Sequence, residues 1–225
     1  HIIVNKTVSL IGENWSTTII DGNRTKTVIE VTADYVNVTS FTIQNGGGPP
    51  YCGIFVGNCI GNTISNNIIR NNAYGIELLK SNSSNMIGNT IMNSSWAGIY
   101  ISNSNENIFY NNIITKNSVG AWIASSTVPN IFYHNNLIDN SEQARPLTTT
   151  YWYNDTEGNY WSDYTGVDTN GDGIGETNTP HSGLDWYPLI IPTRPFPVIW
   201  EDVIYPVAVL GNSTVSGFYF NQSSK

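Results

Sequence analysis

The feature that most constrains the fold of this sequence is a repeat of 22 or 23 residues between positions 53 and 140. A Gly-Ile-x-Ile motif, or a close variant of it, begins at Gly53, Gly75, Gly98 and Gly120. Each repeat contains two further short apolar runs, and Asn, Ser and Gly residues separate the runs. A repeat of this size predicts stacked structural units. Because apolar residues alternate with other residues within a run, we expect three short strands per unit and no helix.

These units predict an all-β fold, a three-sheet parallel β-helix with about 22–24 residues per coil, in which each coil pairs with its two neighbours. The apolar residues would then stack in inward columns. The expected columns are Ile54, Ile76, Ile99 and Ala121; Val56, Leu78, Ile101 and Ile123; and Ile64, Ile87, Phe109 and Phe132, with a further apolar line at Ile69, Met92, Ile114 and Leu137.

Asparagine recurs at the expected turns, in phase with the apolar runs. Asn tolerates left-handed backbone, and its amide can bond to the amide in the next coil. We therefore expect these residues to form structural ladders and not a catalytic site. The expected columns are Asn62, Asn85, Asn107 and Asn130, and Asn72, Ser95, Asn117 and Asn140.

The 225-residue chain divides into three expected parts. Residues 1–145 would form the coils, which are irregular before residue 45 and carry an insertion loop at residues 46–50. Residues 146–190 are rich in aromatic and acidic residues, and large rings there would cap the open apolar end of the last coil. Residues 191–225 begin with a Pro-rich connector, followed by two expected strands at residues 203–210 and 215–220. Those strands would fold back, start a second module or pair with a neighbouring subunit.

Composition and charge narrow the function classes. The formal net charge of −8 argues against nucleic acid or an anionic membrane surface as a partner. No apolar run is long enough to cross a bilayer. The chain opens directly inside an expected strand, which indicates a processed form or a fragment. Cys52 and Cys59 flank another expected strand, so free buried thiols are favoured over a disulfide, which would need a turn between them.

Sequons for N-glycosylation are dense and suit an extracellular or cell-surface protein. Chance is the alternative explanation, because Asn, Ser and Thr are all abundant here. The sequon asparagines are Asn5, Asn14, Asn23, Asn37, Asn82, Asn93, Asn154, Asn212 and Asn221.

Segments after the repeats carry a family resemblance. They read Gly-Asn-Tyr-Trp-Ser-Asp-Tyr at 158–164, Asp-Thr-Asn-Gly-Asp-Gly-Ile-Gly at 168–175 and Tyr-Pro-Leu at 187–189. With the repeats, they resemble right-handed parallel β-helix proteins of the NosD-like type, within the wider pectin-lyase-like fold. Such sequences are common in archaeal surface and secreted proteins. The resemblance covers roughly residues 1–190 and implies the fold more strongly than it implies a function.

The resemblance also implies a periplasmic role in copper-site assembly. Copper handling calls for clustered Met, Cys or His side chains. The soft ligands of this chain are scattered along the sequence, which argues against that role. They are His1, Cys52, Cys59, Met86, Met92, His134 and His181.

An acidic loop is the best candidate metal site. Asp168, Asn170 and Asp172 place oxygen side chains at alternate positions before Gly173, a pattern that wraps a hard cation such as calcium. The backbone carbonyl of Ile174 and the side chain of Glu176 would complete the set, with Asp163 and Asp185 as candidate extra ligands. Position twelve is Thr179 and not the bidentate Glu of a helical calcium hand. We expect a structural ion that locks the cap; an Asx-rich turn without an ion is the alternative.

An outward column on the Gly-Ile strands is the candidate ligand-binding surface. It contains Phe55, Glu77, Tyr100 and Trp122, one from each coil. Coils stack about 4.8 Å apart, so these side chains would form a stripe. Aromatic faces with acids nearby suit sugar rings, but β-propensity with ladder stacking, or a protein contact, would explain the same pattern.

Three function hypotheses remain open. The first is a non-enzymatic extracellular β-solenoid, a structural or adhesive module that is calcium-stabilised and carries a carbohydrate-binding surface. The second is a polysaccharide lyase, hydrolase or epimerase, although the regular coils show no catalytic constellation and no two carboxylates one coil apart on the same face. The third is a copper-maturation accessory protein.

Overall fold

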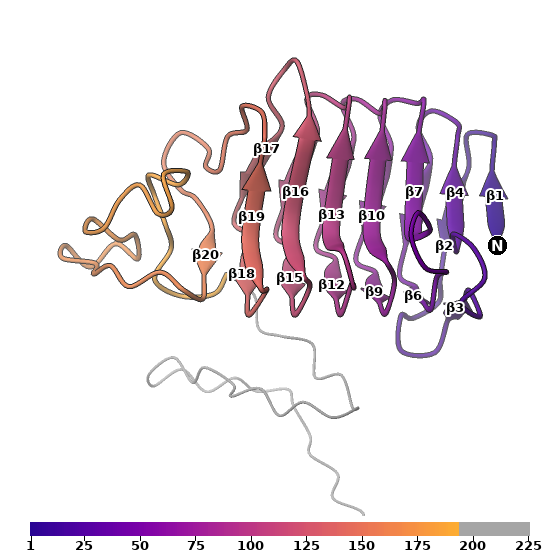
Figure 1. Cartoon of the computed structure of the whole chain (residues 1–225), viewed down its shortest axis with the longest axis horizontal. Helices are drawn as coiled ribbons and strands as arrows, with labels where there is room; N and C mark the ends of the chain where they lie inside the picture. Colours follow the sequence, from indigo (N-terminus) through magenta and orange to yellow (C-terminus); the bar gives the residue numbers. More distant parts are fainter. Residues whose placement is uncertain (194–225) are drawn as a thin grey trace, which may run out of the picture. The chain divides into compact units, whose positions relative to one another are not determined.

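The computed structural model describes residues 1–193, and this range contains strands but no helix. The strands form three parallel sheets of seven, six and seven strands, and the chain visits the three sheets in turn (Figure 1). The predicted parallel β-solenoid is therefore confirmed. The two strands expected at residues 203–210 and 215–220 lie outside the described residues.

The sheets are named here A, B and C. Sheet A contains β1 (Ile2–Val4), β4 (Ile29–Val31), β7 (Cys52–Gly57), β10 (Tyr74–Leu79), β13 (Ala97–Ser102), β16 (Val119–Ser125) and β19 (Glu142–Pro146). Sheet B contains β2 (Ser9–Ile11), β5 (Asn37–Thr39), β8 (Thr63–Ser65), β11 (Asn85–Ile87), β14 (Ile108–Tyr110) and β17 (Ile131–Tyr133). Sheet C contains β3 (Ile19–Asp21), β6 (Thr42–Gln44), β9 (Ile68–Arg70), β12 (Thr90–Met92), β15 (Ile113–Thr115), β18 (Asn136–Ile138) and β20 (Tyr160–Trp161).

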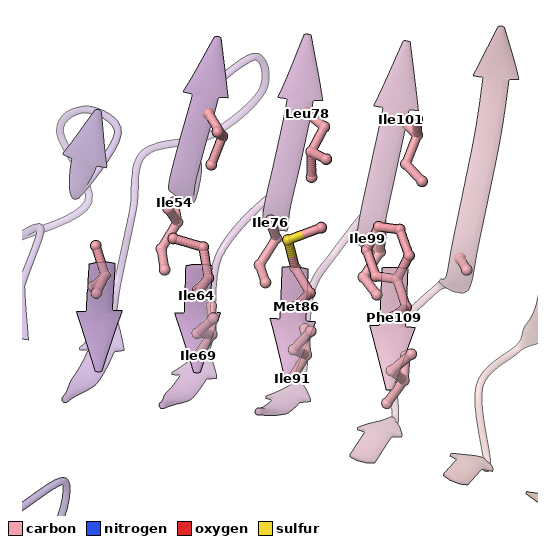
Figure 2. Packing of buried hydrophobic residues seen from close by; sticks show 14 of the residues in the cluster. Ile54, Ile64, Ile69, Ile76, Leu78, Met86, Ile91, Ile99, Ile101 and Phe109 are labelled. Atoms are coloured by element: carbon pink, nitrogen blue, oxygen red, sulfur yellow. The ribbon is translucent and has the colours of Figure 1, made fainter. Parts of the chain in front are cut away.

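The core consists of stacked inward columns, as the repeat predicts. Ile54 pairs with Ile76, which pairs with Ile99, and Ile99 pairs with Ala121. All four side chains are fully buried. Figure 2 shows the labelled side chains of sheets A, B and C pointing into the same interior. Removing them from water is the main stabilising term of such a solenoid, because each coil buries its apolar face only against its neighbours.

One coil departs from the expected register by a single residue. Met86, and not Ile87, lies in the inward column, where it pairs with Ile64 and Phe109 (Figure 2). In sheet C of the same coil, Ile91 lies inward in place of Met92. The expectation for Ile87 and Met92 was therefore wrong. Apolar residues stand at both adjacent positions in each strand, so apolar character alone does not distinguish the two registers.

Asparagine ladders run along the turns and bond successive coils. Asn112 Oδ1 accepts hydrogen bonds from the backbone N–H and the side-chain Nδ2 of Asn89, at 3.0 and 3.1 Å. Asn112 Nδ2 donates to the Met86 carbonyl oxygen at 2.8 Å and to Asn135 Oδ1 at 2.9 Å. Each such amide satisfies backbone groups that the turns would otherwise bury unpaired.

The membership of these ladders differs in part from the expectation. Ser84 and Ser94 take the places expected for Asn85 and Ser95, because the coil that contains them is shifted by one residue. The longest Asn ladder was missed in the sequence. It consists of Asn67, Asn89, Asn112, Asn135 and Asn159.

Aromatic rings cover the last coil. Trp152 stacks on Phe132 with ring centroids 4.6 Å apart, and Trp161 lies 5.3 Å from Trp152. Both tryptophans are 1% exposed. Trp152 continues the inward column of Phe109 and Phe132, whereas Trp161 pairs with Leu137 and continues the inward column of sheet C. The rings close the apolar interior as terminal units of a solenoid must.

Candidate functional site

The outward face of sheet A carries the expected stripe. The parallel register places Phe55 beside Glu77, Glu77 beside Tyr100, and Tyr100 beside Trp122. All four residues are half-buried. The same column continues to Arg145 on β19, which pairs with Trp122. The register of the sheet thus brings together every residue of the expected ligand-binding surface.

Two aromatic residues that the sequence reasoning missed widen this stripe. The ring of Tyr74 lies 5.0 Å from that of Tyr100 and 5.7 Å from that of Trp96. Tyr100 in turn meets Trp122 edge-on at 5.3 Å. Tyr74 has a signal in the sequence, since it stands directly before the glycine of the repeated motif and two residues before an inward Ile on β10. Trp96 lies in the turn before β13 and has no such signal.

A hollow opens between the two tryptophans of this face. It has a volume of about 220 Å³ and is lined by Trp96, Trp122, Arg145 and the serines at positions 95 and 118. The guanidinium carbon of Arg145 lies 4.7 Å from the Trp122 ring centroid, a cation–π contact. Arg145 Nε also donates to both carboxylate oxygens of Glu142, at 3.1 and 2.9 Å. The hollow therefore combines two aromatic walls with a fixed, charge-paired guanidinium.

Glu77 is the acid within the aromatic stripe. Burial raises the pKa of its carboxyl group, and a hydrogen bond with the Cys52 thiol partly offsets that rise. Burial raises the pKa of the Cys52 thiol well above its usual range, and raises the pKa of Tyr74 to about 12. Both cysteines are free and buried, as expected from their spacing. Cys52 is therefore a protonated packing residue and not a nucleophile.

The acidic loop gathers three of the expected metal ligands. Carboxylate oxygens of Asp168, Asp172 and Glu176 lie within 4.8 Å of one another. Asn170 lies against them, and its Nδ2 donates to Asp172 Oδ2 at 3.0 Å. Backbone N–H groups of Gly173 and Gly171 lower the pKa of the Asp168 carboxyl group, which keeps it ionised. This arrangement offers hard oxygen donors of the kind that calcium prefers.

The loop is joined to the end of the described chain by backbone hydrogen bonds. Gly175 N–H donates to the Pro188 carbonyl at 2.8 Å, and Ile190 N–H donates to the Gly173 carbonyl at 3.0 Å. Ile174 forms an antiparallel bridge with Leu189. An ion held by this loop would therefore fix residues 168–176 against the segment 188–190.

The two candidate extra ligands have other partners. Asp185 is fully buried, and its Oδ2 accepts from the Asn159 N–H and the Trp161 indole N–H, both at 2.8 Å. Asp163 pairs with His181 at 3.2 Å. Neither aspartate belongs to the acidic group of residues 168–176. The described residues thus give each of these aspartates a structural role of its own.

The soft metal ligands remain scattered in the fold. Met86 is fully buried in the core, and Met92 is 6% exposed. The histidines pair with three different carboxylates, His1 with Glu30, His134 with Glu157, and His181 with Asp163. Among residues 1–193, the group that brings three His, Cys or carboxylate ligands together is the oxygen cluster of the acidic loop.

Among the described sequon asparagines, Asn37 begins strand β5 and the others lie outside the strands. Asn82 and Asn154 are half-buried, and their Oδ1 atoms accept hydrogen bonds from neighbouring backbone N–H groups. Asn212 and Asn221 lie outside the described residues. The exposed members are Asn5, Asn14, Asn23, Asn37 and Asn93.

Comparison with known proteins gives one family. A family model described as "Periplasmic copper-binding protein (NosD)" matches residues 3–166. A search of curated proteins finds no match to the chain. Within the described range, no helix has the length and apolar character needed to cross a membrane.

Proposed function

The chain belongs to the NosD family, and from that premise we propose that it is a rigid β-solenoid module that acts outside the cytoplasm and binds carbohydrate on the outward face of sheet A. The family description supports a periplasmic or other extracytoplasmic location. The dense sequons, as proposed glycosylation sites, fit the same compartment. A structural or adhesive role is consistent with a molecule whose core is a continuous stack of coils.

The observation that supports this proposal is the continuous aromatic surface. The rings contact one another in the order Trp96, Tyr74, Tyr100, Trp122. Trp96 and Trp122 line the hollow and Tyr100 is half-buried, whereas Tyr74 is buried and supports its neighbours. Amphipathic rings of this kind pack against the apolar faces of a sugar while nearby polar groups bind its hydroxyls. Glu77 and Arg145 supply those polar groups at fixed positions.

Copper is implied by the family description, but the donor atoms of this chain do not fit it. Copper sites use imidazole, thiolate or thioether ligands gathered around one point. All His, Cys and Met residues of the chain lie between positions 1 and 181, and residues 194–225 contain none. The structure places Met86 in the core, buries Met92 on the other side of sheet C, and pairs the three histidines with separate carboxylates. The chain therefore belongs to the family but lacks, within the described residues 1–193, a cluster of His, Cys and Met side chains that could bind copper.

Calcium is the metal that suits the acidic loop. We propose that it binds Asp168, Asp172 and Glu176, with Asn170 and the Ile174 carbonyl as further ligands, and stabilises the cap. The clustered carboxylates and the backbone bonds to residues 188–190 support this role. We propose a structural role for the ion, because the loop follows the last strand of the solenoid, whereas the aromatic surface lies on sheet A.

A glycan array tests the sugar-binding proposal. The intact protein should bind a defined set of glycans, and Trp122→Ala and Trp96→Ala should abolish that binding, because each removes one wall of the hollow. Trp186→Ala is the matched control, since Trp186 is 54% exposed and lies in the cap. Circular dichroism melts confirm that the variants are folded. A blank array, or an equal loss in the control, would contradict the proposal.

A further inference from the structure

A second, larger groove lies between the last coil and the cap. It has a volume of about 570 Å³ and is bordered by residues 139–144, which form a turn and the start of strand β19, and by residues 161–163 at the end of β20 and just after it. Its polar lining includes Asp139, Glu142, Gln143, Asp163 and Ser182. The side chains of Trp161 and Leu184 contribute its apolar part. A concave site with a few convergent polar groups has the composition of a small-ligand site.

Two of these carboxylates occupy equivalent positions in consecutive coils. Strand β18 pairs with β20 so that Leu137 lies beside Trp161, and Asp139 and Asp163 each follow two residues later. The repeat alone does not predict this pair, because Asp163 lies in the segment expected to form the cap and not in the regular coils. The coil register therefore continues past residue 145 and brings two acids to one face.

The polar walls of the groove are held in place by one another. Ser162 Oγ accepts from the Asp139 N–H at 3.0 Å and from Gln143 Nε2 at 2.9 Å. Asn140 Nδ2 donates to Gln143 Oε1 at 2.8 Å. His181, which is buried against Trp161, holds Asp163. Because these side chains are already ordered, a ligand would not have to immobilise them, which favours binding.

The negative charge of the groove restricts the chemical class of ligand that it can bind. Asp139, Glu142 and Asp163 supply three carboxylates; Arg145 pairs with Glu142, and His181 lies 3.2 Å from Asp163. Carboxylates accept hydrogen bonds from hydroxyl and ammonium groups and repel other carboxylates. The whole chain, with a net charge of −8, adds to that repulsion.

From these features we propose that the groove is a second carbohydrate subsite, selective for sugars that carry a free ammonium group or only hydroxyls, and closed to uronic acids. The inference takes its ligand class from the function proposed above but places it at a different site. Glu142 borders the groove and its partner Arg145 borders the hollow beside Trp122, so one oligosaccharide that passes over this ion pair would reach from Trp122 into the groove. An amino sugar in the groove would face the carboxylates with its ammonium group.

Calorimetric titration with three tetrasaccharides tests the charge selectivity. The probes are the tetramers of glucosamine, glucose and galacturonic acid, each titrated into the intact protein. We expect the glucosamine tetramer to bind at least about tenfold more tightly than the galacturonate tetramer, with glucose between them. A preference for galacturonate, or no binding of any probe at millimolar concentration, would overturn the proposal.

Variants separate the groove from the aromatic surface. The double variant Asp139→Asn, Asp163→Asn should weaken glucosamine binding at least about tenfold and reduce the difference between the three probes. Asn is compatible with the left-handed backbone at position 139, where φ is 50°. Asp155→Asn, an exposed substitution in the cap, is the control. If the double variant retains the selectivity of the intact protein, the groove proposal is wrong. If only Trp122→Ala then loses binding, the aromatic-surface proposal still holds.

Discussion

Asp185 ends the longest asparagine ladder by presenting its Oδ2 atom to the backbone N–H of Asn159 at 2.8 Å. In every earlier coil of this ladder, the same N–H donates to the Oδ1 atom of an Asn in the next coil, as in the bond from Asn135 to Asn159 at 3.0 Å. Asp185 thus takes the place of the Asn that a further coil would supply. A second oxygen, Oδ1, accepts from the Tyr187 N–H at 3.0 Å.

This substitution of an acid for an amide makes stability depend on pH. Burial raises the pKa of the Asp185 carboxyl group, and hydrogen bonds from Trp161, Asn159 and Tyr187 only partly offset the rise. In the unfolded chain the pKa is about 3.9. Between the two pKa values the folded state holds a proton that the unfolded state has lost, so the free energy of unfolding falls as pH rises through this window.

Asp185→Asn should therefore remove one component of the pH dependence. As the pH rises from about 4 to 7, we expect the free energy of unfolding of the variant to increase relative to that of the intact protein. Urea denaturation at several pH values measures it. A difference that stays constant over this range, or that changes in the opposite direction, would show that Asp185 is not held with a raised pKa.

Gly158 is required by the close approach of Asp185. A Cβ atom at position 158 would lie 2.0 Å from Asp185 Oδ1, and the backbone is fixed because Gly158 N–H donates to the Tyr187 carbonyl. Gly158→Ala should lower the free energy of unfolding by about 1–3 kcal/mol, or more if the Asp185 bonds are lost. Gly48→Ala is the control, since a Cβ atom at position 48 would have no other atom within 4 Å. Equal stability of the two variants would contradict the ladder-end geometry.

How far the sequence predicts this fold is clear from single residues. The glycine-led motif at Gly53, Gly75 and Gly98 places sheet A in the correct register, because each Gly stands against the next backbone with no room for a Cβ. The shifted strand around Met86 was mispredicted, since Asn85-Met86-Ile87 satisfies the Asn and apolar pattern in the wrong frame. The hydrogen bond from Ser84 N–H to Asn107 Oδ1 shows that Ser84, and not Asn85, occupies the ladder position. The sequence does not mark Ser84 as a ladder residue, because the other positions of this ladder carry Asn.

The candidate sites were predicted to different extents. The outward column through Tyr100 and Trp122 follows from the two-residue alternation of a strand and was predicted, whereas Tyr74 and Trp96 beside it were missed. The ladder-end position of Asp185 could not be assigned from the sequence, because Asp185 lies 26 positions after Asn159 in a segment without the repeat, and only the folded cap brings the two together. The position of the groove residue Asp163 was only partly predictable from the sequence. It follows from the register of β20, but this strand has two residues and gives a weak sequence pattern.

The ladder predicts a large effect for one buried amide. Asn112→Ala would leave the Asn89 N–H without its acceptor and would remove the Asn112 bonds to the Met86 carbonyl and to Asn89 Nδ2, which keeps its bond to the Ile64 carbonyl. At about 1–3 kcal/mol for each buried group left unsatisfied, the free energy of unfolding should fall by ~3 kcal/mol or more. Asn112→Asp keeps the volume but places an acceptor against the Met86 carbonyl oxygen, so it should also destabilise the protein. Chemical denaturation measures both.

An exposed asparagine provides the comparison for that ladder. Asn5→Ala, at an exposed position, should change the free energy of unfolding by no more than about 0.5 kcal/mol. If Asn112→Ala were equally mild, the amide columns would contribute packing at most, and the coil-to-coil bonds would not be a source of stability.

Calcium removal should affect the cap through the acidic loop. A chelator is expected to lower the melting temperature, because an ion at about 100 times its Kd stabilises the folded state by about 2.7 kcal/mol. Hydrogen exchange should quicken at Gly175 and Ile190, whose N–H groups join the loop to the segment 188–190. Glu176→Gln should abolish the response to calcium while keeping an oxygen for the Thr169 N–H, and Glu13→Gln, at an exposed position far along the chain, should leave it intact. An identical melting temperature in chelator and in millimolar calcium would contradict calcium binding by this loop.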